Sequence, residues 1–208
     1  MTLHRTPRPT TVTRPTMTPE PLEGRTLFAA VLPLVTADVV GGELHVVGTR
    51  LSDVITVVQS PTNPNAVEVH SGTSFVGAFD TAAVNSIRLE GGNGHDVLSV
   101  DAALAIPAVL VGGNGRDTLT GGSGADTLQG DNGRDTLNGG SGDDTLEGGN
   151  AKDVLDGGDG NDTLTGGRGR DTVTGGTGTD TYSGDKASEL LDKADDESTL
   201  LPLTGSRT

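Results

Sequence analysis

A nine-residue phrase repeats without interruption through the second half of the chain and constrains its fold more than any other feature. Between residues 112 and 183 it occurs eight times in register, as GGNGRDTLT, GGSGADTLQ, GDNGRDTLN, GGSGDDTLE, GGNAKDVLD, GGDGNDTLT, GGRGRDTVT and GGTGTDTYS. A ninth copy, GGNGHDVLS, stands alone at residues 91–99. Tandem repetition at a fixed short period indicates a solenoid, in which each repeat stacks on its neighbours.

Each position of the phrase has a distinct expected role. The glycines at positions 1 and 2 let the backbone turn, so we expect positions 1 to 6 to form a loop and positions 7 to 9 a short strand. Position 8 is apolar or aromatic in every copy, and strand alternation turns it inward while positions 7 and 9 face outward. Two phrases complete one coil of 18 residues. The sequence therefore predicts an all-β fold, a right-handed parallel β-roll with two nonapeptides per coil.

Position 6 is aspartate in every copy, which points to a metal site. Consecutive loops fall on opposite edges of a roll, so aspartates two repeats apart stack in one column, where they repel each other unless a cation lies between them. The chain has no cysteine, and oxygen ligands favour a hard ion such as calcium, which accepts roughly six to eight of them. The candidate metal ligands are Asp117, Asp135, Asp153 and Asp171 on one edge, Asp126, Asp144, Asp162 and Asp180 on the other, and Asp96 as an extension of the first column.

The phrase resembles the RTX, or haemolysin-type, calcium-binding repeat G-G-x-G-x-D-x-U-x. This resemblance implies that the aspartates and loop carbonyl oxygens bind calcium, about six to seven ions in all, with one ion between successive aspartates of a column. Two copies depart from the phrase, because Asp131 stands at position 2 and Ala151 at position 4. We expect Ala151 to weaken its adjoining site, since glycine is favoured there.

Residues 38–111 show the alternating apolar pattern of strands and have two possible architectures. They continue the winding as a β-helix-like segment with degenerate repeats, or they form a separate small β-sandwich. Asp53 fits position 6 of a worn phrase and precedes Asp96 by 43 residues, close to two coils of the 21 residues that separate Asp96 from Asp117. Residues 101–107 would then form a degenerate loop on the opposite edge.

The two ends of the chain differ from its centre. Residues 1–37 are predicted to be a disordered leader that contains a candidate export segment, an apolar run at 27–35 with a candidate small-residue cleavage site at 35–37. The stretch PLEGRTLFAA at residues 21–30 resembles the N-terminal LEPR-type motif of certain bacterial surface proteins. The roll is expected to span 112–185, and residues 186–208 to form a cap and tail with a short helix at 188–197.

Composition narrows the function. A net charge of −15 argues against nucleic acid as a partner, and no apolar run reaches the length of a transmembrane helix. With 32% hydrophobic residues the chain lacks the material for an ordinary core, so folding is expected to depend on the metal. No catalytic motif stands out, and the chain is predicted not to be an enzyme.

We therefore predict a secreted or cell-surface protein, structural or adhesive, that folds on meeting external calcium. Cell-surface or polysaccharide components are its candidate partners. The alternative is an accessory module of a polysaccharide-acting or other secreted enzyme, although the repeat block offers only five basic residues and one aromatic residue for a sugar-binding groove. Ice binding is disfavoured, because positions 3 and 5 are too irregular to match a lattice.

Overall fold

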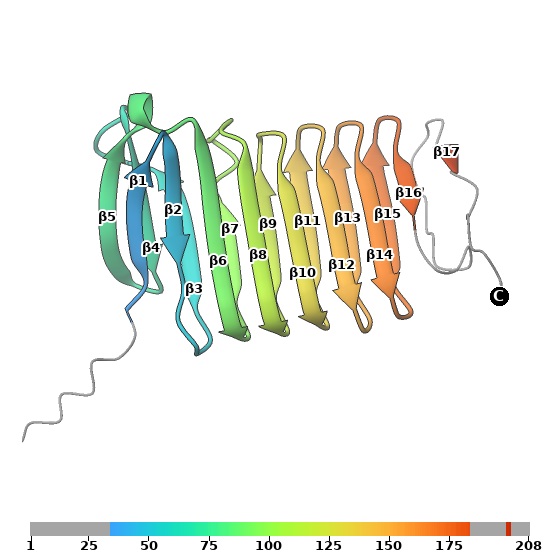
Figure 1. Ribbon diagram of the computed structural model, residues 1–208. Coiled ribbons are helices and arrows are strands. Elements are labelled where there is room, and N and C mark those ends of the chain that lie inside the picture. The colour runs from blue at the N-terminus through green and yellow to red at the C-terminus, as the bar shows by residue number, and fades with distance from the viewer. Residues whose placement is uncertain (1–33, 184–198, 201–208) are drawn as a thin grey trace, which may run out of the picture. The chain divides into compact units, whose positions relative to one another are not determined.

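The computed structural model describes residues 34–183 and 199–200, in which the chain forms two β-sheets and one short 3-10 helix, η1 (Thr81–Ala83) (Figure 1). The first sheet contains, in spatial order, β1 (Thr36–Val40), β2 (Glu43–Val47), β6 (Ser86–Gly94), β8 (Ala108–Gly115), β10 (Thr127–Gly133), β12 (Thr145–Asn150), β14 (Thr163–Arg168), β16 (Thr181–Ser183) and β17 (Thr199–Leu200). The second contains β15 (Thr172–Thr177), β13 (Val154–Asp159), β11 (Thr136–Ser141), β9 (Thr118–Gly122), β7 (Val97–Val100), β3 (Val54–Gln59), β4 (Ala66–Ser71) and β5 (Ser74–Asp80).

The repeats wind as predicted. From β6 to β16 the chain alternates between the two sheets, and each strand pairs in parallel with the strand one coil further on (Figure 1). The register is offset by one coil of two phrases, so that Leu128 faces Leu146 and Leu137 faces Leu155. The predicted all-β parallel β-roll is confirmed.

The core is a narrow ladder of position-8 side chains. Members from both sheets meet between them and are at most 4% exposed: Leu98, Leu119, Leu128, Leu137, Leu146, Leu155, Leu164, Val173 and Tyr182. Their position-7 neighbours, such as Thr118 and Thr136, face solvent. Each coil thus contributes only two large apolar side chains to the core. The free energy gained by burying them is small beside the conformational entropy lost when the backbone of the coil is ordered.

The expected division between loop and strand was wrong. Strands run from position 7 through position 3 of the next phrase, as in β12 and β13, and the loop is reduced to positions 4 to 6. The glycine pair stays within the ladder, since Gly140 pairs with Gly158 at φ of 105° in both. A glycine can bend the strand there without leaving its hydrogen-bonding register, so no separate turn is needed.

Residues 38–111 continue the roll and do not form a separate sandwich. Strand β2 pairs in parallel with β6, and β3 pairs in parallel with β7, so both sheets pass through this segment. Asp53 and Asp96 are therefore one coil apart. The expectation of two coils between them was wrong, because the interval holds an inserted hairpin, β4–β5, followed by η1.

At the end of the roll that is N-terminal in sequence, the outermost strands of both sheets are antiparallel. Strand β1 folds back on β2 through a two-residue turn at Gly41 and Gly42, whose φ angles of 63° and 91° suit glycine. On the second sheet β4 and β5 add to β3, and the core widens with the buried Val67 and Val69.

Several predictions for the chain ends fall outside the described residues. The apolar run of the leader, the LEPR-type motif and the helix at 188–197 lie there, and the boundaries at 37 and 185 stay predictions. Of the candidate cleavage site at 35–37, Thr36 and Ala37 belong to β1, so cleavage after Ala37 would shorten that strand. Within the part of the chain that the structure describes, no helix is long and apolar enough to cross a membrane.

Candidate metal centre

The position-6 aspartates form two columns, one along each edge of the roll. Column A comprises Asp53, Asp96, Asp117, Asp135, Asp153 and Asp171, and column B comprises Asp126, Asp144, Asp162 and Asp180. Within a column, one carboxylate oxygen, Oδ1, accepts a hydrogen bond from the backbone N–H of the aspartate one coil earlier, at 2.7–3.0 Å. The columns predicted from sequence are therefore continuous structural features.

The other carboxylate oxygen, Oδ2, is buried. In all nine aspartates predicted as ligands it has no hydrogen-bond partner among the described residues, and these side chains are at most 5% exposed. A buried acceptor without a partner is strongly unfavourable, more so when it carries charge. Nine such atoms in regular array fit a positively charged partner.

The surroundings of Oδ2 suit a hard cation. A Cβ atom added to Gly148, at position 1, would lie 2.7 Å from Oδ2 of Asp153 and 2.7 Å from the carbonyl oxygen of Gly166 on the next coil. The same holds at Gly130, with 2.7 Å to Oδ2 of Asp135 and 2.6 Å to the carbonyl oxygen of Gly148. The first glycine thus keeps open a space bordered by a carboxylate and a carbonyl oxygen, the ligand types that calcium prefers.

Carboxylates alone do not complete a ligand set. Among residues 34–183 and 199–200, no three acidic or histidine side chains gather closely enough to hold a metal ion. Any ion in a column must therefore take most of its ligands from backbone carbonyl oxygens, as the resemblance implied.

Burial makes seven of these aspartates difficult to ionise without a cation. It raises the pKa of Asp135 to about 7 and those of Asp126, Asp144, Asp153 and Asp162 to about 6, against an ordinary value of 3.8. Burial also raises the pKa of Asp96 and of Asp117. Repulsion from neighbouring aspartates adds to the effect at Asp135.

This pKa shift predicts an unusual dependence of stability on pH. Because the folded carboxyls hold their protons to higher pH than unfolded ones, the calcium-free roll is most stable below about pH 4 and loses that stability as pH rises through about 6 to 7. In excess chelator we expect more strand signal in circular dichroism at about pH 5 than at about pH 8. With calcium the trend should reverse, since protons compete with the ion; equal signal at both pH values in chelator would contradict this prediction.

The first position of each column is difficult to recognise as such from the sequence. Column A starts at Asp53, whose Oδ2 accepts hydrogen bonds from the Thr49 backbone N–H at 2.6 Å and from Thr49 Oγ1 at 2.9 Å. Its carboxylate is thus satisfied by its own loop, and it ends the column without an open acceptor. The position of Asp53 in the phrase, position 6, indicated that it belongs to column A, but Asp53 was not among the predicted ligands.

Column B starts where an alanine replaces the aspartate. The N–H of Ala108 donates to Oδ1 of Asp126 at 2.7 Å, and the backbone at Ile106 lies against Gly124. Residues 101–107 therefore form the degenerate loop on the opposite edge, as the spacing predicted.

The two departures from the phrase are the two residues other than glycine with positive φ in the described ranges, Asp131 at 69° and Ala151 at 90°. Asp131 is close to the ordinary left-handed region, which aspartate tolerates. Position-4 glycines such as Gly133 and Gly160 have φ of 139° and 145°, so the backbone at Ala151 is turned away from the usual loop shape. The structure thus locates strain where the sequence predicted a weak site.

Replacing Ala151 by glycine should relieve this strain. We expect Ala151→Gly to raise the free energy of unfolding in calcium by about 1 kcal/mol or more, because a left-handed Cβ conformation costs about that much. The midpoint of calcium-induced folding, followed by circular dichroism, should fall. Asp131→Gly serves as the matched control with a smaller gain, and a destabilised Ala151→Gly variant would contradict the prediction.

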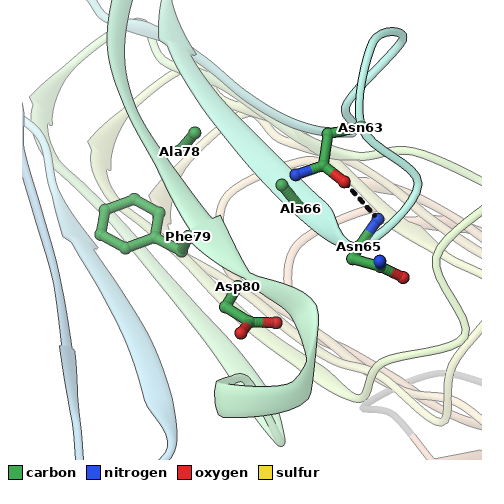
Figure 2. A pocket seen from close by; sticks show the side chains of 6 residues that line it. All are labelled: Asn63, Asn65, Ala66, Ala78, Phe79 and Asp80. Atoms are coloured by element: carbon green, nitrogen blue, oxygen red, sulfur yellow. Dashed lines mark hydrogen bonds between the residues drawn. The ribbon is translucent and has the colours of Figure 1, made fainter.

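A shallow hollow lies at the other end of the second sheet, away from the repeats. Figure 2 shows its lining: Asn63, Asn65, Ala66, Ala78, Phe79 and Asp80. Two of its polar atoms are bonded locally, because Asn63 Oδ1 accepts from the Asn65 N–H at 3.0 Å and Asp80 Oδ1 from the Ala82 N–H at 3.0 Å. It contains none of the predicted ligands.

A roll with two carboxylate columns open to hard cations defines the class as a calcium-binding β-roll, and comparison with known families agrees. The RTX calcium-binding nonapeptide repeat, as a unit of four copies, matches residues 111–146 and 147–182. Comparison with curated proteins and with solved structures gives no match. The chain therefore carries RTX calcium-binding nonapeptide repeats, which bind calcium and form its β-roll. The LEPR-type motif stays a prediction.

Proposed function

We propose that the aspartates of columns A and B, from Asp96 and Asp126 onward, are calcium ligands together with loop carbonyl oxygens. The nine buried Oδ2 atoms without hydrogen-bond partners among the described residues carry this proposal. Column A has four intervals from Asp96 to Asp171 and column B has three, so about seven ions are expected, one per interval. The Asp53–Asp96 interval is not counted, because Thr49 already satisfies the Asp53 carboxylate.

We propose further that the protein is exported and acts as a structural or adhesive component outside the cell, without catalytic activity. RTX repeats typify secreted bacterial proteins, and a fold that depends on calcium becomes rigid where the ion is abundant. The calcium-dependent scaffold supports this proposed role. Most side chains at positions 7 and 9 of its strands are polar and at least partly exposed to solvent.

The location of the protein tests this role. An antibody against residues 112–183 should label intact producing cells or their medium, and lysing the cells should add little signal. A cytoplasmic protein of known location provides the control. Signal that appears only after lysis would contradict export, and would leave the calcium assignment to be judged by ion binding.

A further inference from the structure

The basic side chains of the described residues are gathered on one edge of the roll. Seven lysines and arginines occur in residues 34–183, and six of them lie in the loops of column A. Four occupy position 5 of successive coils and form what we call the basic row: Arg116, Arg134, Lys152 and Arg170. Arg50 and Arg168 flank it at position 3. All six are exposed.

The row is regular because the coils stack. Adjacent strands of a sheet lie about 4.8 Å apart, so successive position-5 residues recur at this spacing. The stacking of these loops is direct: the Arg116 N–H donates to Nδ1 of His95 one coil earlier, at 2.8 Å. Asn132 pairs in register with Asn150, and Asn150 with Arg168.

The opposite edge has the same loop geometry and no basic side chain in it. Positions 3 and 5 of the column B loops are neutral or acidic: Ser123, Ala125, Ser141, Asp143, Asp159, Asn161, Thr177 and Thr179. Asp143 and Asn161 there bond to each other along the column, at 2.8 Å from the Asn161 N–H to Asp143 Oδ1. The repeat itself therefore does not require basic residues at position 5.

The basic row is not needed to balance the negative charge of the buried aspartates. Column B buries four carboxylates with no lysine or arginine at positions 3 and 5 of its loops, so the fold tolerates such a column without them. The row is also unpaired within the described ranges, where the ion pairs are His45–Glu90, His70–Glu68 and Arg88–Glu90. Exposed like charges at this spacing repel one another, a repulsion that an external anion would remove.

A second row of polar groups runs beside the first. Asn93, Asn114, Asn132 and Asn150 occupy position 3 on the same edge, and each later amide donates to Oδ1 of the one before, at 2.9–3.1 Å. This bond uses one N–H of the amide in Asn114, Asn132 and Asn150 and leaves the second, for which no described residue is the acceptor. The edge thus presents cations and amide donors in parallel at a single repeating distance.

We propose that this edge binds a linear acidic polysaccharide that carries a carboxylate on successive sugars, with the basic row on the carboxylates and the asparagine row on the hydroxyls. Arginine pairs well with carboxylates through two parallel hydrogen bonds. Positions 3 and 5 of these loops contain no phenylalanine, tyrosine or tryptophan, and His95 is the one aromatic ring among them on which a nucleic-acid base could stack. These positions also contain no apolar side chain that could enter a membrane.

Calcium should strengthen this binding, a step that rests on the proposed ligands. Each calcium ion that binds in an interval of column A brings two positive charges beneath the basic row, whereas each interval contributes one carboxylate. The edge therefore becomes more positive as the ion binds. The calcium form is also the ordered form, in which the row is correctly spaced.

The test uses the full chain with saturating calcium and a fluorescent oligogalacturonide too short to gel, followed by fluorescence anisotropy at low salt. We expect Arg116→Ser/Arg134→Ser/Lys152→Ser to weaken binding by at least about tenfold, because three charge contacts are lost. The charge-conserving control Arg116→Lys/Arg134→Lys/Lys152→Arg should bind within a few-fold of the wild type. The same oligomer with its carboxylates methyl-esterified should bind neither variant nor wild type, and excess chelator should abolish binding.

Calcium titration of each variant by circular dichroism separates this inference from the proposed ligands. If the wild type and the serine variant fold alike in calcium but bind the oligomer equally, or not at all, the inference is wrong and the calcium assignment stands. If calcium does not order the chain, the proposed ligands fail independently of the oligomer. Equally tight binding to single-stranded DNA or to anionic lipid vesicles would overturn the choice of an acidic polysaccharide, as would undiminished binding in chelator.

Discussion

Removal of calcium at neutral pH is expected to unfold the repeats between residues 112 and 183. In calcium-free solution the fold must bury nine carboxylate oxygens without partners, around a core of only two large apolar side chains per coil. Each ion that binds the folded state alone, at about a hundred times its dissociation constant, stabilises that state by about 2.7 kcal/mol. We therefore expect the strand signal of the repeats in circular dichroism to disappear in excess chelator and to return cooperatively as calcium is added.

The N-terminal coils should respond less strongly, which provides an internal control. There the core is wider, with Ile55, Val57, Val67 and Val69 all fully buried, and antiparallel strands complete the sheets. Amide exchange in chelator should protect residues in β2 to β5 more than those in β10 to β15. Magnesium at the same concentration should not restore the repeats, since it demands tighter octahedral geometry and keeps its water. Full strand signal in chelator would show that folding does not depend on calcium.

The period of the sequence predicted most of what organises this fold. Alternation placed the position-8 residues inside, and the two-repeat spacing assigned each aspartate to its column. The strand boundaries were predicted wrongly, because a glycine such as Gly140 can bend the chain without leaving the ladder, and composition does not distinguish such a bend from a loop. Asp53 escaped assignment because the inserted hairpin β4–β5 hides the one-coil spacing to Asp96.

The difference in charge between the two edges of the roll was not predicted from the sequence, for a different reason. The residues at position 5 look irregular when all repeats are read in order, and this irregularity argued against ice binding. They become regular once alternate repeats are assigned to opposite edges, since one edge then receives Arg116, Arg134, Lys152 and Arg170. Their exposure and their lack of ion pairs among the described residues depend on neighbouring loops, and so required the structure.

Neutralising aspartates of column A should remove calcium ions in whole steps. Asp171 borders one interval of the column, Asp135 borders two, and Asp135 with Asp153 borders three. Asparagine keeps the Oδ1 acceptor for the backbone N–H one coil earlier and replaces the charged Oδ2 with an amide donor, which cannot bind a cation. From about seven ions in the wild type, we expect about six in Asp171→Asn, about five in Asp135→Asn and about four in Asp135→Asn/Asp153→Asn, by equilibrium dialysis.

The steps distinguish lost ligands from lost structure. If the substitutions merely unfolded the roll, all ions would be released together and the strand signal would vanish, because stacked coils depend on their neighbours. The matched control Glu147→Gln/Asp156→Asn removes the same charge from exposed position-9 side chains on the outer face and should keep about seven ions. If the control loses as many ions as the column variants, then general charge and not the buried carboxylates holds the calcium. If the column variants keep the wild-type count, the ligands lie elsewhere in the loops, and the buried Oδ2 atoms must find another partner.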